Sequence, residues 1–184
     1  MLLPFVPTSA SAAGLQCPIA TDTLISQAVG STAEGGIMTD PLDPTKPLDN
    51  GPDTTACIWD TDVGDTVFVT RQAGIFGPGG ATGPLEVAVK ASTIPDDARQ
   101  QVQAMRDAGI ADINLPTFQI STVDGMGDAA VYVLNNKVDM HVVSSNFIVQ
   151  RGLDAYTFGV IADDELSAKP RAHAVAEAVL ASLP

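Results

Sequence analysis

The residues with the clearest chemical potential are carboxylates that crowd into one short stretch. The segment Asp60–Thr66, with the sequence DTDVGDT, places three carboxylates within one turn, and such oxygen-rich turns are typical of calcium sites. The segment lacks the glycine at the sixth position and the terminal bidentate acid of a helix-flanked calcium loop, so we expect a solvated hairpin turn. Further aspartates that keep calcium open as an alternative lie in a proline-rich stretch: Asp40, Asp43, Asp49 and Asp53. No other cofactor is expected.

A glycine-containing motif stands at Asp124–Ala130, with the sequence DGMGDAA. A nucleotide-binding loop needs a third glycine and a following helix whose N-terminus receives phosphate. This motif lacks the third glycine, and a strand rather than a helix is expected to follow it. We expect a turn in which Gly125 and Gly127 adopt backbone angles closed to other residues, and in which Asp128 bonds the local backbone.

Catalytic side chains are not marked by any local signature. No serine elbow is present, and no Ser-His-Asp order is apparent. The two histidines, His141 in an alternating strand and His173 in a helix, are each expected to be surface or packed residues. The chain is therefore interpreted as a non-enzymatic binding module, with a hydrolase or calcium-dependent enzyme of scattered active-site residues as the alternative.

The net charge of the chain limits the kinds of partner that it is expected to bind. The 184 residues include 22 Asp and Glu against 9 Lys and Arg, which gives a formal net charge of −13. Such a chain does not bind nucleic acid or an anionic membrane through a basic surface. No run approaches the ~20 apolar residues that span a bilayer, so a transmembrane segment is not expected.

The N-terminus resembles the end of an export signal. A short apolar stretch, Leu2–Val6, precedes small residues with an A-x-A pattern at Ala10–Ala12. A charged n-region and half of the apolar segment are missing, so residues 1–13 are interpreted as a signal-peptide remnant. Residues 14–184 then form a single secreted domain, and the expected location is secreted, periplasmic or in the cell envelope.

The only two cysteines, Cys17 and Cys57, allow one pairing, and we expect a disulfide in an exported protein. Trp59 follows Cys57 by two residues and so shares its face of the strand. Packing against the disulfide is one interpretation of Trp59. The alternative places Trp59, together with Phe76, at the rim of a ligand cleft.

The first half of the chain predicts one helix and one hairpin. Thr21 to Gly30 is a capped amphipathic helix, residues 31–55 form an irregular loop, and Cys57 to Arg71 form a hairpin. The glycine-rich segment Gly74–Pro84 is a mobile loop. Leu85–Ala91 is compatible with either a strand or a helix.

The second half predicts a helix, a strand meander and a closing helix. The first helix is capped by Thr93 and stopped by Gly109, with Ala98, Val102 and Met105 as its buried stripe. A helix over Ser167–Leu183 closes the chain. The strands between them are FQISTV, AAVYVLNN, KVDMHVV, NFIVQR and AYTFGVI, with a tight turn at Asn135-Asn136 and a break at Ser144-Ser145. The fold class is therefore α+β, a two-layer domain in which an antiparallel sheet of about five to seven strands packs with about three helices.

Four features occur in a set order along the chain: a cysteine before a first helix that ends in Val29-Gly30, the C-x-W of Cys57 and Trp59, the G-x-G-D-x-A step at Gly125–Ala130 and an alanine-rich last helix. This order resembles that of actinobacterial exported lipoprotein domains of unknown function, with an α+β fold like that of the photosystem extrinsic protein P. The resemblance implies an antiparallel sheet flanked by helices, a cysteine pair and a cell-envelope location, and no catalytic residues. The chain differs from these lipoproteins at the lipoprotein box. Gln16 directly precedes Cys17, so lipid anchoring at Cys17 is not expected.

We expect a ligand site on a concave sheet face between helices, bordered by the Gly74–Pro84 loop. The expected partner is a small apolar ligand or an envelope protein.

Overall fold

The computed structural model describes residues 15–51, 53–109, 115–137 and 142–184. Its centre is a seven-stranded antiparallel sheet with the strand order β1-β4-β5-β9-β8-β7-β6. The strands are β1 (Ala33–Ile37), β4 (Thr54–Thr61), β5 (Thr66–Gln72), β6 (Thr117–Val123), β7 (Ala129–Lys137), β8 (Val142–Arg151) and β9 (Asp154–Ala162). The α+β class with an antiparallel sheet is confirmed.

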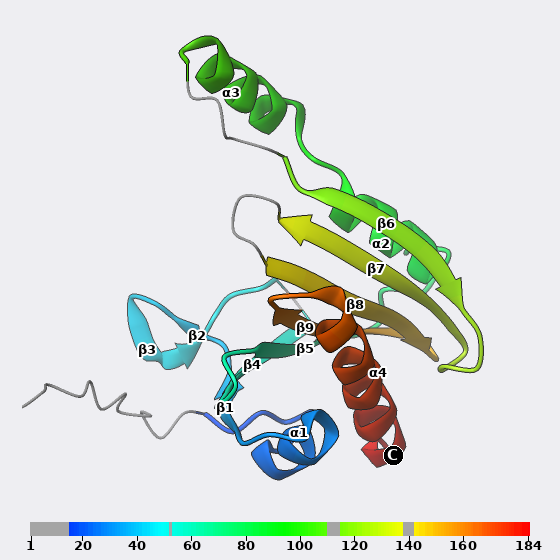
Figure 1. Cartoon of the computed structure of the whole chain (residues 1–184). Helices are drawn as coiled ribbons and strands as arrows, with labels where there is room; N and C mark the ends of the chain where they lie inside the picture. The colour runs from blue at the N-terminus through cyan, green and yellow to red at the C-terminus, as the bar shows by residue number, and fades with distance from the viewer. Residues whose placement is uncertain (1–14, 52, 110–114, 138–141) are drawn as a thin grey trace, which may run out of the picture.

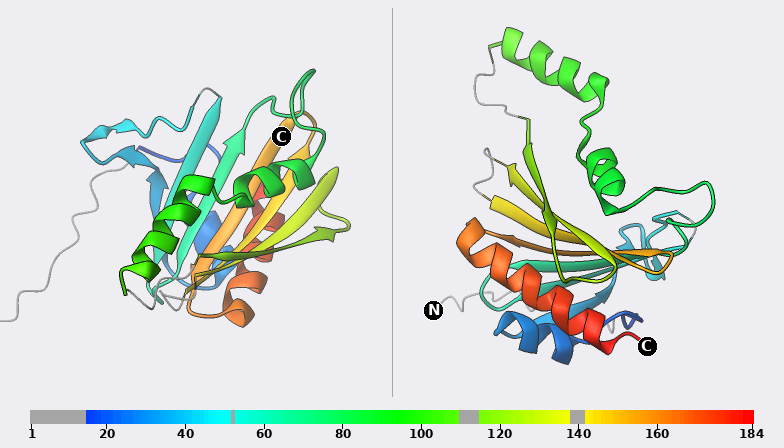
Figure 2. Two further views of the ribbon diagram at one scale, coloured as in Figure 1. Left: turned by 90° about the horizontal axis from the view of Figure 1, so that it is seen from above. Right: turned by 90° about the vertical axis from the view of Figure 1, so that its right-hand side faces the viewer.

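The helices divide between the two faces of the sheet. The helices α1 (Asp22–Val29) and α4 (Glu165–Ser182) pack together against one face, and α2 (Pro84–Ser92) lies over the other (Figures 1 and 2). The helix α3 (Asp96–Asp107) extends away from the sheet (Figure 1). The predicted first, second and last helices correspond to α1, α3 and α4. The segment left open between strand and helix, Leu85–Ala91, is helical and forms α2.

The main core lies between the sheet and the α1–α4 pair. Alternation in β5 buries Val67 and Val69 on this face, as expected for a strand with one side turned to the core. The apolar face of α4, which packs on β8, β9 and α1, is fully buried in the same core: Ala168, Ala172, Val175, Ala176 and Val179. Thr21 accepts a hydrogen bond from the Leu24 N–H and Gly30 ends α1 in the left-handed region, so both predicted caps are confirmed.

The predicted irregular loop over residues 31–55 is wrong. β1 pairs with β4, and a small second sheet forms from β2 (Thr39–Asp40) and β3 (Asp43–Pro47). Glycine and proline lower strand propensity, which hides these strands in the sequence. Gly35 has a structural role in β1, because a Cβ there would collide with the Ile58 carbonyl of β4.

The predicted turn at Asn135-Asn136 and the break at Ser144-Ser145 are also wrong. All four residues lie inside strands, with Asn135 opposite Ser144 and Asn136 opposite Val143 in the β7–β8 ladder. Ladder pairing over nine positions overrides the local turn preference of these polar residues. Part of the predicted strand KVDMHVV, residues 138–141, lies outside the described residues.

The helix α3 corrects a third prediction. It begins after Pro95, and Thr93 instead ends α2. No residue of α3 is buried, and Met105 of the predicted buried stripe is 44% exposed. An amphipathic pattern indicates a face suited to burial, but it does not show that the chain supplies a surface to cover that face.

Cys17 and Cys57 form a disulfide, as predicted, with their Cα atoms 5.9 Å apart. Cys57 is fully buried in β4, and Cys17 lies just before α1. The crosslink therefore ties the start of the described chain to the sheet. Within the described residues, none of the helices is long and apolar enough to cross a membrane.

Candidate ligand-binding cavity

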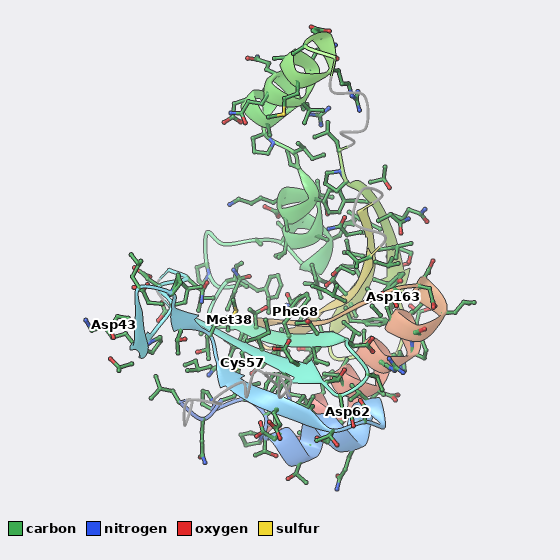
Figure 3. All side chains as sticks on the ribbon, turned by 60° about the vertical axis from the view of Figure 1, so that its left-hand side comes forward. Met38, Asp43, Cys57, Asp62, Phe68 and Asp163 are labelled. Carbon is green, nitrogen blue, oxygen red and sulfur yellow. A yellow bond between two sulfur atoms is a disulfide. The ribbon has the colours of Figure 1, made fainter. Side chains whose placement is uncertain are left out.

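The sheet face that carries α2 holds a cavity of about 790 Å³. Its floor is made by residues of six adjacent strands that point away from the main core. The floor residues are Thr54 of β4, Phe68, Thr70 and Gln72 of β5, Thr157 of β9, Ser144, Asn146 and Ile148 of β8, Val133 and Asn135 of β7, and Phe118 of β6. Figure 3 shows Phe68 on the side of the sheet that faces α2.

One continuous segment of chain forms the roof. The loop contributes Ile75, Gly79, Gly80 and Ala81, and α2 contributes Glu86, Val87, Ala88, Lys90, Ala91 and Ser92. At one end, Ala88 is fully buried against Val131, Val133 and Ile148, which anchors α2 on the sheet. The roof therefore touches the sheet firmly at this end and leaves space over β5 and β9.

Gly159 keeps the floor open at its centre. A Cβ at this position of β9 would collide with the ring of Phe68 and with Oδ1 of Asn146, which both line the cavity. The absence of a side chain allows the Phe68 ring to lie across β9 instead of standing up into the cavity. The shape of the floor therefore depends on a glycine that does not itself line it.

The polar residues at the centre of the floor bond to one another. Asn146 Nδ2 donates to the carbonyl oxygens of Val133 and Ser144 at 3.2 and 3.3 Å, and its Oδ1 accepts from Ser144 Oγ at 3.1 Å. Ser144 is buried. This pair holds β7 and β8 together from the cavity side, and both functional atoms of the Asn146 amide are occupied.

Asn135 differs from its neighbours. Its Oδ1 is buried and has no hydrogen-bond partner among the described residues. The β6–β7–β8 register places Asn135 between Phe118 and Ser144, and all three residues line the cavity. An unpaired buried carbonyl oxygen is unusual in a folded protein, and such groups mark sites for a ligand, an ion or water.

The glycine-rich loop is anchored at its start by Asp154. Asp154 Oδ1 accepts the Gly74 N–H at 2.8 Å, and Oδ2 accepts from Arg71 Nε and Nη2 at 2.8 and 2.7 Å. Partial burial of Asp154 acts to raise its pKa, but these donors outweigh burial and hold the pKa below its usual value. The Phe76 N–H also donates to the Leu153 carbonyl at 3.0 Å.

Opposite charges stand at the rim of the cavity, on α2. Glu86 Oε2 accepts from the backbone N–H and the hydroxyl of Thr82, both at 2.8 Å, which lowers the Glu86 pKa. Lys90 lies one turn later on the same helix and is exposed. The carboxylate thus fastens the start of α2, and the remaining lining side chains are uncharged.

The two residues predicted at a cleft rim do not line this cavity. Trp59 is fully buried in the main core, and its Nε1 donates to Asp22 Oδ1 of α1 at 2.8 Å. The first interpretation of Trp59, packing in the core with the disulfide, describes its position. Phe76 is half-buried in the loop, and its neighbour Ile75 reaches the cavity instead. The predicted location of the site, a sheet face bordered by the Gly74–Pro84 loop, matches the cavity.

Most of the aspartates considered for calcium already bond to other groups of the protein. Asp65 of the β4–β5 turn forms an ion pair with Arg171 of α4, and Asp60 accepts from the Thr66 hydroxyl. Asp43 accepts from Thr45 and pairs with Lys46, while Asp49 accepts the Gly51 N–H. Across residues 15–51, 53–109, 115–137 and 142–184, no group of three or more metal-ligating side chains comes together.

His173 does not line the cavity. His173 lies on α4, on the opposite face of the sheet, within 3.4 Å of Glu177. His141 lies outside the described residues. In the glycine motif, Gly125 and Gly127 do adopt positive φ in a turn, and Asp128 accepts the Gly152 N–H from the β8–β9 turn rather than a local donor.

The sequence carries a signal for this site in the apolar runs of two central strands. β7 is buried at consecutive positions from Ala130 to Leu134, and β8 from Phe147 to Val149. Uninterrupted apolar runs indicate strands covered on both faces, so a second layer over the sheet follows from them. Which polar residues enter the cavity depends on the register, which the sequence alone does not determine.

A comparison of the chain with models of protein families and with curated proteins finds no match.

Proposed function

We propose that this chain is an exported, non-enzymatic binding protein that holds a small apolar ligand in the cavity between the sheet and α2. The observation that carries the proposal is the cavity itself, since about 790 Å³ lies within the range of small-molecule sites. Its walls combine aromatic and aliphatic side chains with a few neutral polar groups, which is the usual composition of such sites.

The roof supports the same proposal. A single segment made of a hydrogen-bonded loop and one short helix covers the cavity, and it is tethered at Asp154 and at Ala88. Such a roof can open while the main core on the other face stays intact. Export is supported by the disulfide, which persists in oxidising compartments, and by the resemblance to exported envelope domains.

The test is binding of a neutral, environment-sensitive dye, N-phenyl-1-naphthylamine, followed by its fluorescence. Thr70→Trp fills the floor of the cavity and is expected to weaken dye binding at least about tenfold. Thr66→Trp is the matched control, because Thr66 lies four residues earlier on the same face of β5 but does not line the cavity. Thermal unfolding of both variants checks that each of them is folded.

A second readout identifies the natural ligand. Protein isolated from its native source is analysed by native mass spectrometry for a bound neutral compound, which the Thr70→Trp variant is expected to lack. Equal dye binding by the wild type and Thr70→Trp, with no compound retained by either, would contradict the proposal.

A further inference from the structure

We propose that Asn135 selects the ligand of this cavity, accepting a hydrogen bond through Oδ1 from a hydroxyl or N–H group on an otherwise apolar, neutral molecule. This inference rests on the proposed binding function and adds a chemical class to it. It is carried by the one buried side-chain oxygen of the cavity wall that lacks a partner among the described residues.

The other polar groups nearby do not compete for this role. Asn146 Nδ2 already donates to the carbonyl oxygens of Val133 and Ser144, and its Oδ1 already accepts from the Ser144 hydroxyl. A ligand group that displaced these bonds would gain little, because each new bond would replace one already made. Asn135 Oδ1 has no such bond to lose, so a donor placed there is a net gain.

Access to the oxygen needs only a local movement. Asn135 lines the cavity, and the last torsion of an asparagine side chain is soft, so a rotation of the amide can aim Oδ1 at a ligand. The strand that carries Asn135 is held on both sides by Phe118 of β6 and Ser144 of β8. The backbone position of the acceptor is therefore well defined even though its amide can turn.

The surroundings of Asn135 define the rest of the ligand. Phe118, Val133 and Ile148 form an apolar wall beside it, which suits a hydrocarbon or aromatic body. The charged lining groups, Glu86 and Lys90, stand on α2 at the rim, and Glu86 is already bonded to Thr82. A net charge of −13 further disfavours an anion. The matching molecule is neutral and has one donor.

Two probes of nearly equal shape test the inference. 2-Naphthol and 2-methoxynaphthalene share an aromatic body and an oxygen acceptor, but only 2-naphthol donates a hydrogen bond. Each is titrated against the dye-loaded full chain. Wild-type protein is expected to bind 2-naphthol about tenfold more tightly, the ratio that corresponds to one hydrogen bond of about 1.4 kcal/mol.

Variants assign the preference to Asn135. Asn135→Leu removes the acceptor and is expected to reduce the ratio to about one, while 2-methoxynaphthalene still binds. Asn135→Ala gives the same test if leucine disturbs packing. Thr157→Val is the matched control, because it removes a hydroxyl from the same floor and is expected to keep the wild-type ratio.

The outcomes separate the two proposals. Equal binding of the two probes by wild type, or a preference that survives in Asn135→Leu and Asn135→Ala, would overturn the role of Asn135 and leave the cavity as a binding site. A preference lost in Thr157→Val but kept in the Asn135 variants would move the acceptor to Thr157 and overturn it as well. Failure of both probes and of the dye to bind would overturn the binding function itself.

Discussion

Gly159 shows how a single residue shapes the cavity without lining it. We expect Gly159→Ala to push the Phe68 ring toward the cavity, because the new Cβ would collide with that ring. Overpacking of this kind costs about 1–3 kcal/mol. Thermal unfolding and dye titration should show both lower stability and weaker binding.

The control for this change is Gly83→Ala. Gly83 has an extended backbone, and a Cβ there would meet no atom within 4 Å. Stability and dye affinity are expected to stay close to wild type. If Gly159→Ala behaves like Gly83→Ala, the Phe68 ring does not depend on the glycine.

At the scale of elements, the glycine-rich loop depends on an ionised Asp154. The lowered pKa means that folding favours the charged carboxyl, so its contribution is fully present above the unfolded pKa of about 3.9 and is lost as the pH falls through the lower folded value. We therefore expect stability and dye affinity to fall below about pH 4 and to be insensitive to pH near neutrality, where Asp154 is fully ionised in both states.

Asp154→Asn isolates this contribution. The variant loses the Arg71 ion pair and weakens the bond to the Gly74 N–H, so dye affinity at pH 7 is expected to fall. The remaining acid dependence should become shallower than that of wild type, as measured by chemical unfolding from pH 2.5 to 7. An unchanged pH profile would show that other carboxylates cause the acid loss.

The elements differ in how far the sequence predicts them. α1, α4 and the β4–β5 hairpin follow from periodicity and caps, because their local preferences agree with their final surroundings. β1 and the middle of β7 depend on partners distant in the chain, and the ladder overrides the turn preference of Asn135. The cavity's place beside the loop was predictable from the glycine-rich segment. Asn135 as its acceptor was not, because it requires the register.

At the scale of the whole molecule, the disulfide joins segments 40 residues apart. Closing a loop of that length constrains the unfolded chain by about 4 kcal/mol on the entropic model. We expect reduced wild type, or Cys17→Ala combined with Cys57→Ala, to lose about this much stability in guanidinium unfolding. The single tryptophan, Trp59, is fully buried and reports the transition.

The reduced protein is the control for the double variant, because it keeps both cysteine side chains in the core. A loss below about 1 kcal/mol in both would show that the crosslink adds little to folding. Alkylation of the native protein, followed by intact mass, is expected to find both thiols blocked until reduction.

The segment that connects β5 to β6 can vary in sequence more freely than the main core. The sheet order sets three strands, β9, β8 and β7, between these two, so the chain must cross the sheet, and it does so as the roof of the cavity (Figure 2). The stabilising core lies on the other face, under α1 and α4. Substitutions at the exposed positions of the crossing segment therefore cost the main core little, so this segment can change in sequence while the sheet, α1 and α4 keep their packing.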